Sequence, residues 1–187
     1  MERTKALKEA LAQNYSPAQI ENFFAYTLSQ DDDTLIRETL QAVLHHIPSK
    51  AMACTQISAA WAAMIEDHSQ IPVSVVCGDL SYFGTQLFVC HSAIPTSAPG
   101  TTITGHWDGH CWLEFGGVIA DASIFRTIYH GEVPDRLKNQ IKAQFGEGSG
   151  AIIGTPDQMT ANHFTYVPRY TLGKMQIDGI ITGLLLG

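Results

Sequence analysis

Residues 109–123, Gly-His-Cys-Trp-Leu-Glu-Phe-Gly-Gly-Val-Ile-Ala-Asp-Ala-Ser, decide how the central part of this chain folds. A Gly-Gly pair between two alternating runs is typical of a two-residue β-hairpin turn. With the turn at Gly116-Gly117, Phe115 pairs with Val118, and directly paired side chains share a face. One face is then apolar and carries Cys111, Leu113, Phe115, Val118, Ala120 and Ala122, whereas the other carries His110, Trp112, Glu114, Ile119, Asp121 and Ser123. A shift of one residue would mix these sets, so this register is predicted.

The polar face of this hairpin brings an imidazole and a carboxylate together. In the predicted register Trp112 pairs with Asp121 and His110 pairs with Ser123, so Asp121 is the diagonal neighbour of His110. Diagonal neighbours lie about 7–8 Å apart along the backbone, within reach of both side chains. A histidine oriented by a carboxylate is the base that a thiol or hydroxyl nucleophile needs.

Cys54 is the predicted nucleophile, because it opens an apolar helix. Ile57, Trp61 and Ile65 follow the spacing of a helix face that packs on a core. A thiol at the start of such a helix meets free backbone N–H groups and the positive end of the helix dipole, which both favour thiolate. The same N–H groups can stabilise an oxyanion. The other cysteines, Cys77, Cys90 and Cys111, are expected to be small buried hydrophobic residues.

Four segments carry a family resemblance: the Cys54 helix, Ile71-Pro-Val-Ser-Val-Val76, His110-Cys-Trp-Leu-Glu114 and Asp121-Ala-Ser123. Together they resemble the transglutaminase-like superfamily of papain-type thiol enzymes. There a helix-borne Cys is followed by strands with the patterns G-I-P-A-R-V, H-A-W-x-E and D-P-T. The likeness covers about residues 48–127. Ala122 replaces the Pro of the last pattern, and no Gln or Trp shortly before Cys54 offers a second oxyanion donor.

The resemblance implies a catalytic triad and a class of reaction. Cys54 is the nucleophile, His110 the general base and acid, and Asp121 the residue that orients His110. The implied substrate is a peptide or protein amide, and no cofactor or metal is required. Water as acceptor makes the protein a cysteine peptidase, amidase or deamidase, and an amine makes it a transglutaminase-type acyltransferase.

Two other classes of protein stay open at this point. The first is a catalytically inactive binding module of the same fold, with Trp107, Trp112 and the 92–105 loop lining a groove; in an enzyme, these two Trp side chains would bind substrate and the loop would serve as a lid. The second is a zinc protein, since zinc favours Cys and His ligands. Its ligands would come from His106, His110, Cys111, Glu114 and the Cys90-His91 pair, although no Cys-x2-Cys or His-Glu-x2-His pattern occurs.

The predicted fold is α+β, with N-terminal helices and the Cys54 helix packed on a mostly antiparallel sheet. We expect a single transglutaminase-like domain over residues 1–187, in which residues 1–47 form one helical layer. Ser16-Pro17-Ala-Gln19 predicts a capped helix start, Asp31-Asp-Asp33 a cap and solvated turn, and Pro48-Ser49 a break. A later helix is predicted for residues 135–145 and a strand for residues 163–172.

Composition limits the binding partners and the cellular compartment that we expect for this protein. The chain of 187 residues has 11 basic and 18 acidic residues, a net charge of -7. This charge makes it a poor general binder of nucleic acid or of anionic membranes. Met1–Lys8 lacks the apolar core of a signal peptide, and the apolar residues 179–187 are too few to span a bilayer. With four unpatterned cysteines, these features favour a cytoplasmic protein with reduced thiols and leave export without a signal open.

Overall fold

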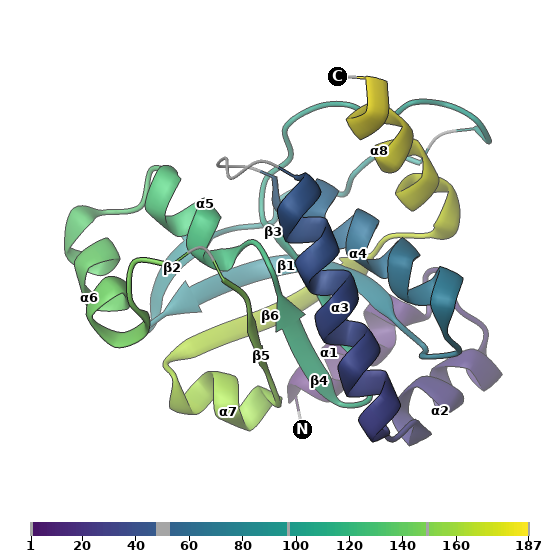
Figure 1. Cartoon of the computed structure of the whole chain (residues 1–187), viewed down its shortest axis with the longest axis horizontal. Coiled ribbons are helices and arrows are strands. Elements are labelled where there is room, and N and C mark those ends of the chain that lie inside the picture. The colour runs from purple at the N-terminus through teal and green to yellow at the C-terminus, as the bar shows by residue number, and fades with distance from the viewer. Residues whose placement is uncertain (1, 48–52, 97, 149, 187) are drawn as a thin grey trace.

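A computed structural model describes residues 2–47, 53–96, 98–148 and 150–186 (Figure 1). The predicted break at Pro48-Ser49 lies outside the described residues. The helices are α1 (Glu2–Leu11), α2 (Pro17–Ala25), α3 (Gln30–His46), α4 (Cys54–His68), α5 (Ile124–His130), α6 (Asp135–Phe145), α7 (Pro156–Ala161) and α8 (Lys174–Leu186). The strands are β1 (Ser74–Tyr82), β2 (Thr85–Phe88), β3 (His110–Phe115), β4 (Val118–Asp121), β5 (Ile152–Gly154) and β6 (Phe164–Thr171).

The strands form one open sheet in the order β2-β1-β3-β4-β5, with β6 paired to β1. The pairings of β1 with β2, β3 and β6, of β3 with β4, and of β4 with β5 are antiparallel. The predicted α+β fold with a mostly antiparallel sheet is therefore confirmed. Strand β1 is central, because β3 and β2 pair along one of its edges and β6 along the other.

The β3–β4 hairpin has the predicted register. Phe115 pairs with Val118, and the register continues through Glu114 to Leu113, which pairs with Ala120. Gly116 and Gly117 have φ angles of 54° and 74°, so the turn uses the left-handed conformation that glycine adopts without strain. Beyond Ala120, strand β4 pairs its last residue, Asp121, with Ile152 of β5.

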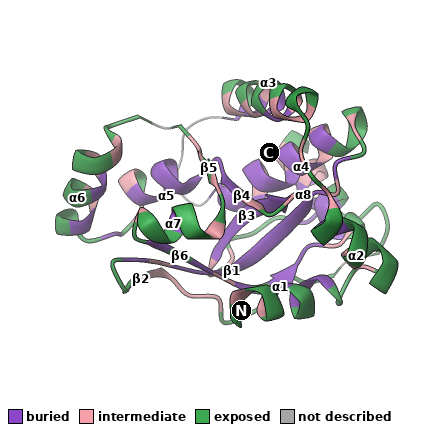
Figure 2. Ribbon diagram, turned by 90° about the horizontal axis from the view of Figure 1, so that it is seen from below, coloured by how far each residue is buried: buried purple, intermediate pink, exposed green. Residues whose placement is uncertain are grey.

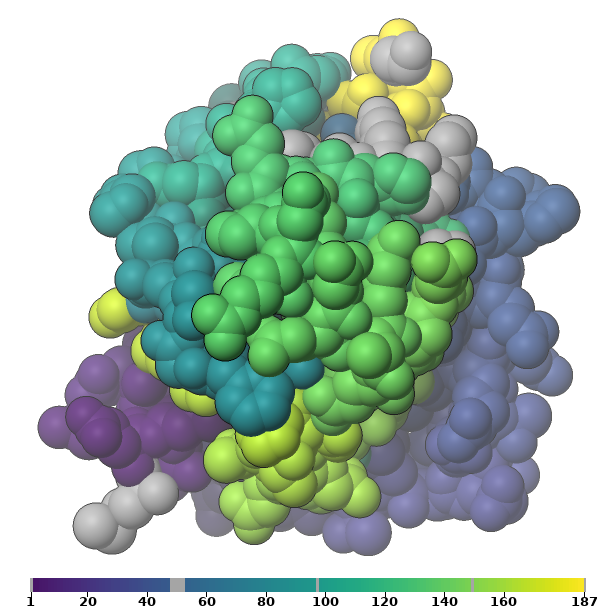
Figure 3. All heavy atoms as spheres, turned by 90° about the vertical axis from the view of Figure 1, so that its left-hand side faces the viewer, coloured from purple at the N-terminus to yellow at the C-terminus, as the bar shows by residue number. Residues whose placement is uncertain are grey.

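Buried residues, purple in Figure 2, lie on both faces of the sheet, where the hydrophobic ones form two cores. The apolar face of the hairpin packs with Ile57, Trp61 and Ile65 of α4, and α3 and α8 complete this layer. The opposite core gathers residues from α1, α5, α6, α7 and the other face of the sheet, among them Leu7, Trp112, Ile128, Ile141 and Met159. On that side, α5 and α6 lie beside the β1–β2 hairpin (Figure 3).

The N-terminal helices do not form the single layer that we predicted. Helix α1 packs on β6 and adds Leu7 and Leu11 to one core, whereas α3 packs on α4 on the other side of the sheet. The amphipathic pattern of each helix identifies a buried face but not the surface that covers it. An ion pair between Arg3 of α1 and Glu114 of β3 contributes to the placement of α1.

The acidic run Asp31-Asp-Asp33 is also placed differently from the prediction. It forms the first turn of α3 rather than a solvated turn before the helix. Ser29 is the N-cap, its hydroxyl accepts from the Asp32 backbone N–H, and Asp32 accepts in return from the Ser29 backbone. Acidic residues in a first helical turn face the positive end of the helix dipole, which explains the placement.

Candidate functional site

His110 and Asp121 meet inside the protein, as the hairpin register predicts. His110 Nε2 lies 2.6 Å from Oδ2 of Asp121, and both side chains are 0% exposed. Because a carboxylate has only acceptors, Nε2–H is the donor in this bond. The other ring nitrogen, Nδ1, is buried and has no hydrogen-bond partner among the described residues. It is the nitrogen left to accept a proton.

Asp121 is held by donors on both carboxylate oxygens. Oδ1 accepts from the Ser123 backbone N–H at 3.0 Å, from the Ser123 hydroxyl at 3.1 Å and from the Ile124 N–H at 2.9 Å. Oδ2 accepts from the Tyr166 hydroxyl at 3.0 Å as well as from His110. These five donors suit a charged carboxylate and fix its orientation towards the imidazole.

Tyr166 and Phe88 belong to this site, although sequence reasoning did not identify them. The Phe88 ring stacks on the His110 ring with centroids 5.3 Å apart and planes at 20°. Burial, followed by Asp121, raises the pKa of Tyr166 well above its usual value, so this hydroxyl stays a donor. Tyr166 lies 45 residues after Asp121 in sequence. Only the pairing of β6 with β1 brings it near, and no local motif reveals that contact.

Of the two predicted substrate-binding Trp side chains, Trp112 lies in the interior. It is 0% exposed and stacks with the His110 ring, with centroids 6.4 Å apart. Its indole N–H donates to Glu114. Trp112 is buried because the polar face of the hairpin is covered by the second core rather than by solvent. Trp107 is half-buried and packs against the core that contains α4.

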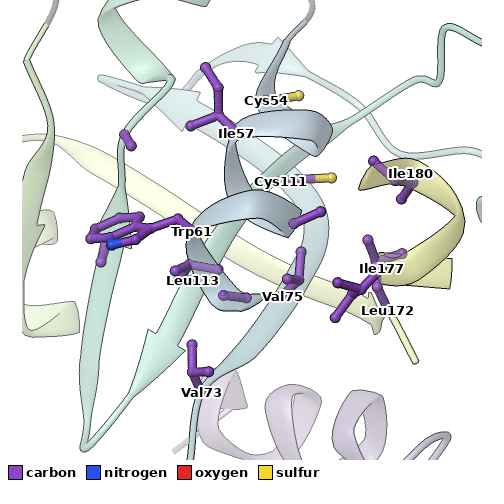
Figure 4. Packing of buried hydrophobic residues seen from close by; sticks show 14 of the residues in the cluster. Cys54, Ile57, Trp61, Val73, Val75, Cys111, Leu113, Leu172, Ile177 and Ile180 are labelled. Carbon is purple, nitrogen blue, oxygen red and sulfur yellow. The ribbon is translucent and has the colours of Figure 1, made fainter. Parts of the chain in front are cut away.

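Cys54 lies in the first turn of α4, with its sulfur near Cys111 of the strand beneath (Figure 4). The N-cap residue, Ala53, makes no side-chain capping bond. The first N–H groups of a helix have no partner within the helix, and the described N-cap side chain does not bind those of α4. Cys54 is 6% exposed, and its Sγ lies 3.9 Å from the hydroxyl of Thr55.

The thiol of Cys54 and the imidazole of His110 interact across this site. Burial lowers the pKa of His110. The Asp121 carboxylate raises this pKa by more than burial lowers it, and Cys54 raises it further, so the pKa of His110 is raised to about 10. His110 in turn lowers the pKa of Cys54. No hydrogen bond of normal geometry joins the two side chains in the part of the chain that the structure describes. Such contacts often tighten only when substrate binds.

The surroundings of Cys54 oppose the thiolate that a helix N-terminus favours. The adjacent Cys111 thiol, together with burial, raises the pKa of Cys54 above the ordinary thiol range, and His110 offsets only part of this. The thiol is enclosed in a core and lies beside a second thiol.

The candidate zinc ligands are not brought together. Within the described ranges, no group of three or more His, Cys, Asp or Glu side chains has the geometry to hold a metal ion. His110 is committed to Asp121, and Glu114 to Arg3 and Trp112. Cys111 points to the opposite face of the strand, as its place in the other core shows.

Hydrogen bonds hold the 92–105 loop near both of its ends. Residue 97 lies outside the described residues. The Ile94 N–H donates to the Tyr170 hydroxyl at 3.0 Å, and Gln176 of α8 donates to the Ile94 carbonyl at 2.7 Å. At the other end, the Ile103 N–H donates to the Gly179 carbonyl. A lid over Cys54 would have to open by breaking these contacts.

Two pockets of the described residues are lined by neither Cys54 nor His110. One of about 200 Å³ lies between α1, α2 and the entry to β1, and another of about 380 Å³ lies between Phe83 and Leu137. Among the helices that the structure describes, none is long and apolar enough to cross a membrane.

Comparisons of the chain with models of protein families, with curated proteins and with solved structures find no match. The resemblance to the transglutaminase-like superfamily therefore stays a prediction.

Proposed function

We propose that this protein is a thiol-dependent acyl-transfer enzyme in which Cys54 is the nucleophile, His110 the base and acid, and Asp121 the residue that orients His110. The observation that carries the proposal is the buried bond between His110 Nε2 and Asp121, which leaves Nδ1 without a partner among the described residues. A base oriented in this way and interacting with a thiol at a helix N-terminus suits nucleophilic catalysis.

The reaction would begin with transfer of the Cys54 proton to Nδ1 of His110. The sulfur attacks the carbonyl carbon of an amide, and the developing oxyanion is stabilised by the backbone N–H groups at the start of α4. His110 then gives the proton to the leaving amine, and a thioester to Cys54 remains. Water or a second amine attacks the thioester, with His110 accepting its proton, and the thiol is restored.

The two pKa shifts favour proton transfer during the attack over a thiolate formed beforehand. A raised pKa makes His110 a strong base once its Nδ1 has lost its proton, which happens increasingly as pH rises towards about 10. A raised pKa keeps the Cys54 thiol protonated at rest, so its proton leaves only as His110 accepts it. The substrate class is a peptide or protein amide, in keeping with the family that residues 48–127 resemble.

A non-catalytic binding module is the second candidate, and the burial of the site favours it. His110 and Asp121 are fully buried and Cys54 is 6% exposed, so a substrate needs an opening before it can reach the sulfur. In such a module the His110–Asp121 bond would be a structural contact of the core.

An activated ester separates the two candidates without knowledge of the natural substrate. The protein is incubated with p-nitrophenyl acetate, and acetylated cysteines are located by mass spectrometry. The proposed enzyme acetylates Cys54 in preference to the more exposed Cys90, and an added primary amine speeds release of the acetyl group. Cys54→Ala should lose this turnover and Cys90→Ala should keep it. Acetylation of Cys90 alone would favour the binding module.

A further inference from the structure

Cys77 and Cys111 form a close thiol pair in the interior. Their sulfur atoms lie 2.8 Å apart, and the two residues are direct partners in the antiparallel register of β1 and β3. Directly opposed residues of such strands have Cα atoms about 4.5–5.5 Å apart. This separation falls in the range that disulfides span, about 4.4–6.8 Å. A bond between the sulfurs would therefore need only a small change in side-chain rotation.

Both thiols of this pair are buried, and the Thr55 hydroxyl and Tyr170 lie close to them. Cys77 is 2% exposed and Cys111 is 4% exposed. The Thr55 hydroxyl lies 3.4 Å from Cys111 Sγ and 3.9 Å from Cys54 Sγ, so it contacts both thiols. Tyr170 lies beside the pair, since the pKa of its hydroxyl is raised by burial and then by both thiols.

We propose that Cys77 and Cys111 are the site of a reversible disulfide, formed by a peroxide and broken by a dithiol. One sulfur, as thiolate, attacks hydrogen peroxide, the O–O bond breaks, and hydroxide leaves and becomes water with the proton that the thiol released. The second thiol attacks the resulting sulfenic acid, the S–O bond breaks, the S–S bond forms, and a second water leaves. Two electrons pass from the thiols to the peroxide.

The register explains why Cys77 rather than another cysteine is the partner of Cys111. Cys90 follows β2, and its sulfur contacts the carbonyl of Ser92 at 3.7 Å. Cys54 is on a helix, and its sulfur touches the Thr55 hydroxyl rather than lying across a strand pair. Only Cys77 is held opposite Cys111 by backbone pairing on both sides of it in β1.

The disulfide would also change the environment of Cys54. It consumes the Cys111 thiol, which is the largest cause of the raised pKa of Cys54. Oxidation of Cys77 and Cys111 to a disulfide would thus regulate the reactivity of Cys54. This consequence rests on the proposed function, whereas the disulfide itself does not.

Peptide mapping without reduction tests the proposal, provided that the right protease is chosen. Trypsin leaves all four cysteines in one fragment, because no Lys or Arg lies between Lys50 and Arg126. Cleavage after Asp and Glu separates them, since Glu66, Asp79 and Asp108 each lie between successive cysteines. The native protein is treated with hydrogen peroxide, free thiols are blocked with N-ethylmaleimide under denaturing conditions, and the digest is searched for linked peptides.

The expected product is one linked pair, of the peptides that contain Cys77 and Cys111, which dithiothreitol reverses. Cys90→Ala is the matched control and should give the same pair, and Cys77→Ala should give none. Cys54→Ala should also retain the pair, so failure of the proposed enzyme activity would leave this result intact. A link from Cys54 or Cys90 to Cys111, or four blocked thiols after oxidation, would overturn the proposal.

Discussion

His110 donates from Nε2 to Oδ2 of Asp121 over 2.6 Å, in a site where neither side chain reaches solvent. The carboxylate is in turn held by the hydroxyl of Tyr166 and by the backbone that follows β4. This arrangement selects the tautomer of the imidazole, since the proton on Nε2 leaves Nδ1 as the basic nitrogen.

Asp121→Asn should reverse the tautomer of His110. The backbone donors on Oδ1 keep the amide oxygen in place, so the amide NH₂ faces His110 and makes Nε2 an acceptor. The proton then sits on Nδ1, and acetylation of Cys54 by the ester should fall by roughly 10²-fold or more. Tyr166→Phe is the matched control. It removes one donor from Asp121, costs about 1 kcal/mol of stability and preserves the tautomer. Equal losses of acetylation in the two variants would contradict the account.

The His110–Asp121 pair should make stability depend on pH in a specific window. The pKa of His110 is raised to about 10 in the folded protein, whereas an unfolded histidine titrates near about 6.5. A raised pKa stabilises the folded state fully below the unfolded value, and the contribution is lost as pH rises through the folded value. The difference in free energy of unfolding between wild type and Asp121→Asn should therefore narrow from about pH 6 to about pH 10. Urea denaturation at several pH values measures it, and a difference that widens over this range would refute the assignment.

Cys111→Ala should make Cys54 more reactive. The Cys111 thiol is the largest cause of the raised pKa of Cys54, whereas His110 lowers this pKa. Removal of the Cys111 thiol should therefore lower the pKa of Cys54. The pH midpoint of Cys54 alkylation should move down, and the rate at pH 8 should rise several-fold. Cys90→Ala alters a thiol outside this cluster and should leave the profile unchanged. The explanation fails if both variants shift it equally.

Arg3→Met should weaken the attachment of α1 to the sheet. Glu114 is 5% exposed, burial raises the pKa of its carboxyl, and Arg3 is the cation that counters this effect. Loss of the cation leaves a buried carboxylate unpaired, so the free energy of unfolding should fall by about 2 kcal/mol. Adding Glu114→Gln should recover part of the loss, because the amide oxygen still accepts from Trp112. Failure of this second change to help would show that the ion pair is not the cause.

The features that could be predicted from sequence are those whose cause is local. The Gly116-Gly117 turn and the alternation on either side of it determine the hairpin register, and that register brings His110 to Asp121. The capping box at Ser16 and Gln19 likewise places the start of α2. In each case neighbouring residues carry the whole signal.

The features that escaped prediction depend on distant parts of the chain. Tyr166 reaches Asp121 only through the pairing of β6 with β1, and Cys77 meets Cys111 only through the register of β1 with β3. Trp112 has the alternation of an exposed side chain, but a second core covers its face. The raised pKa of Cys54 follows from the same long-range packing, because its cause is Cys111 and burial rather than its place on the helix.

The alkylation rate of Cys54 with and without His110 tests the central claim most directly. Wild type and His110→Gln are treated with iodoacetamide at a series of pH values up to about 10, where His110 loses its proton. Labelling of each cysteine is followed in the Asp/Glu digest, with Cys90 as the internal reference. Circular dichroism establishes that the variant is folded. If His110 takes the proton of Cys54, Cys54 labels in wild type and its rate falls by roughly 10²-fold in His110→Gln, while Cys90 is unaffected. Equal Cys54 rates in the two folded proteins would contradict the claim that His110 activates this thiol.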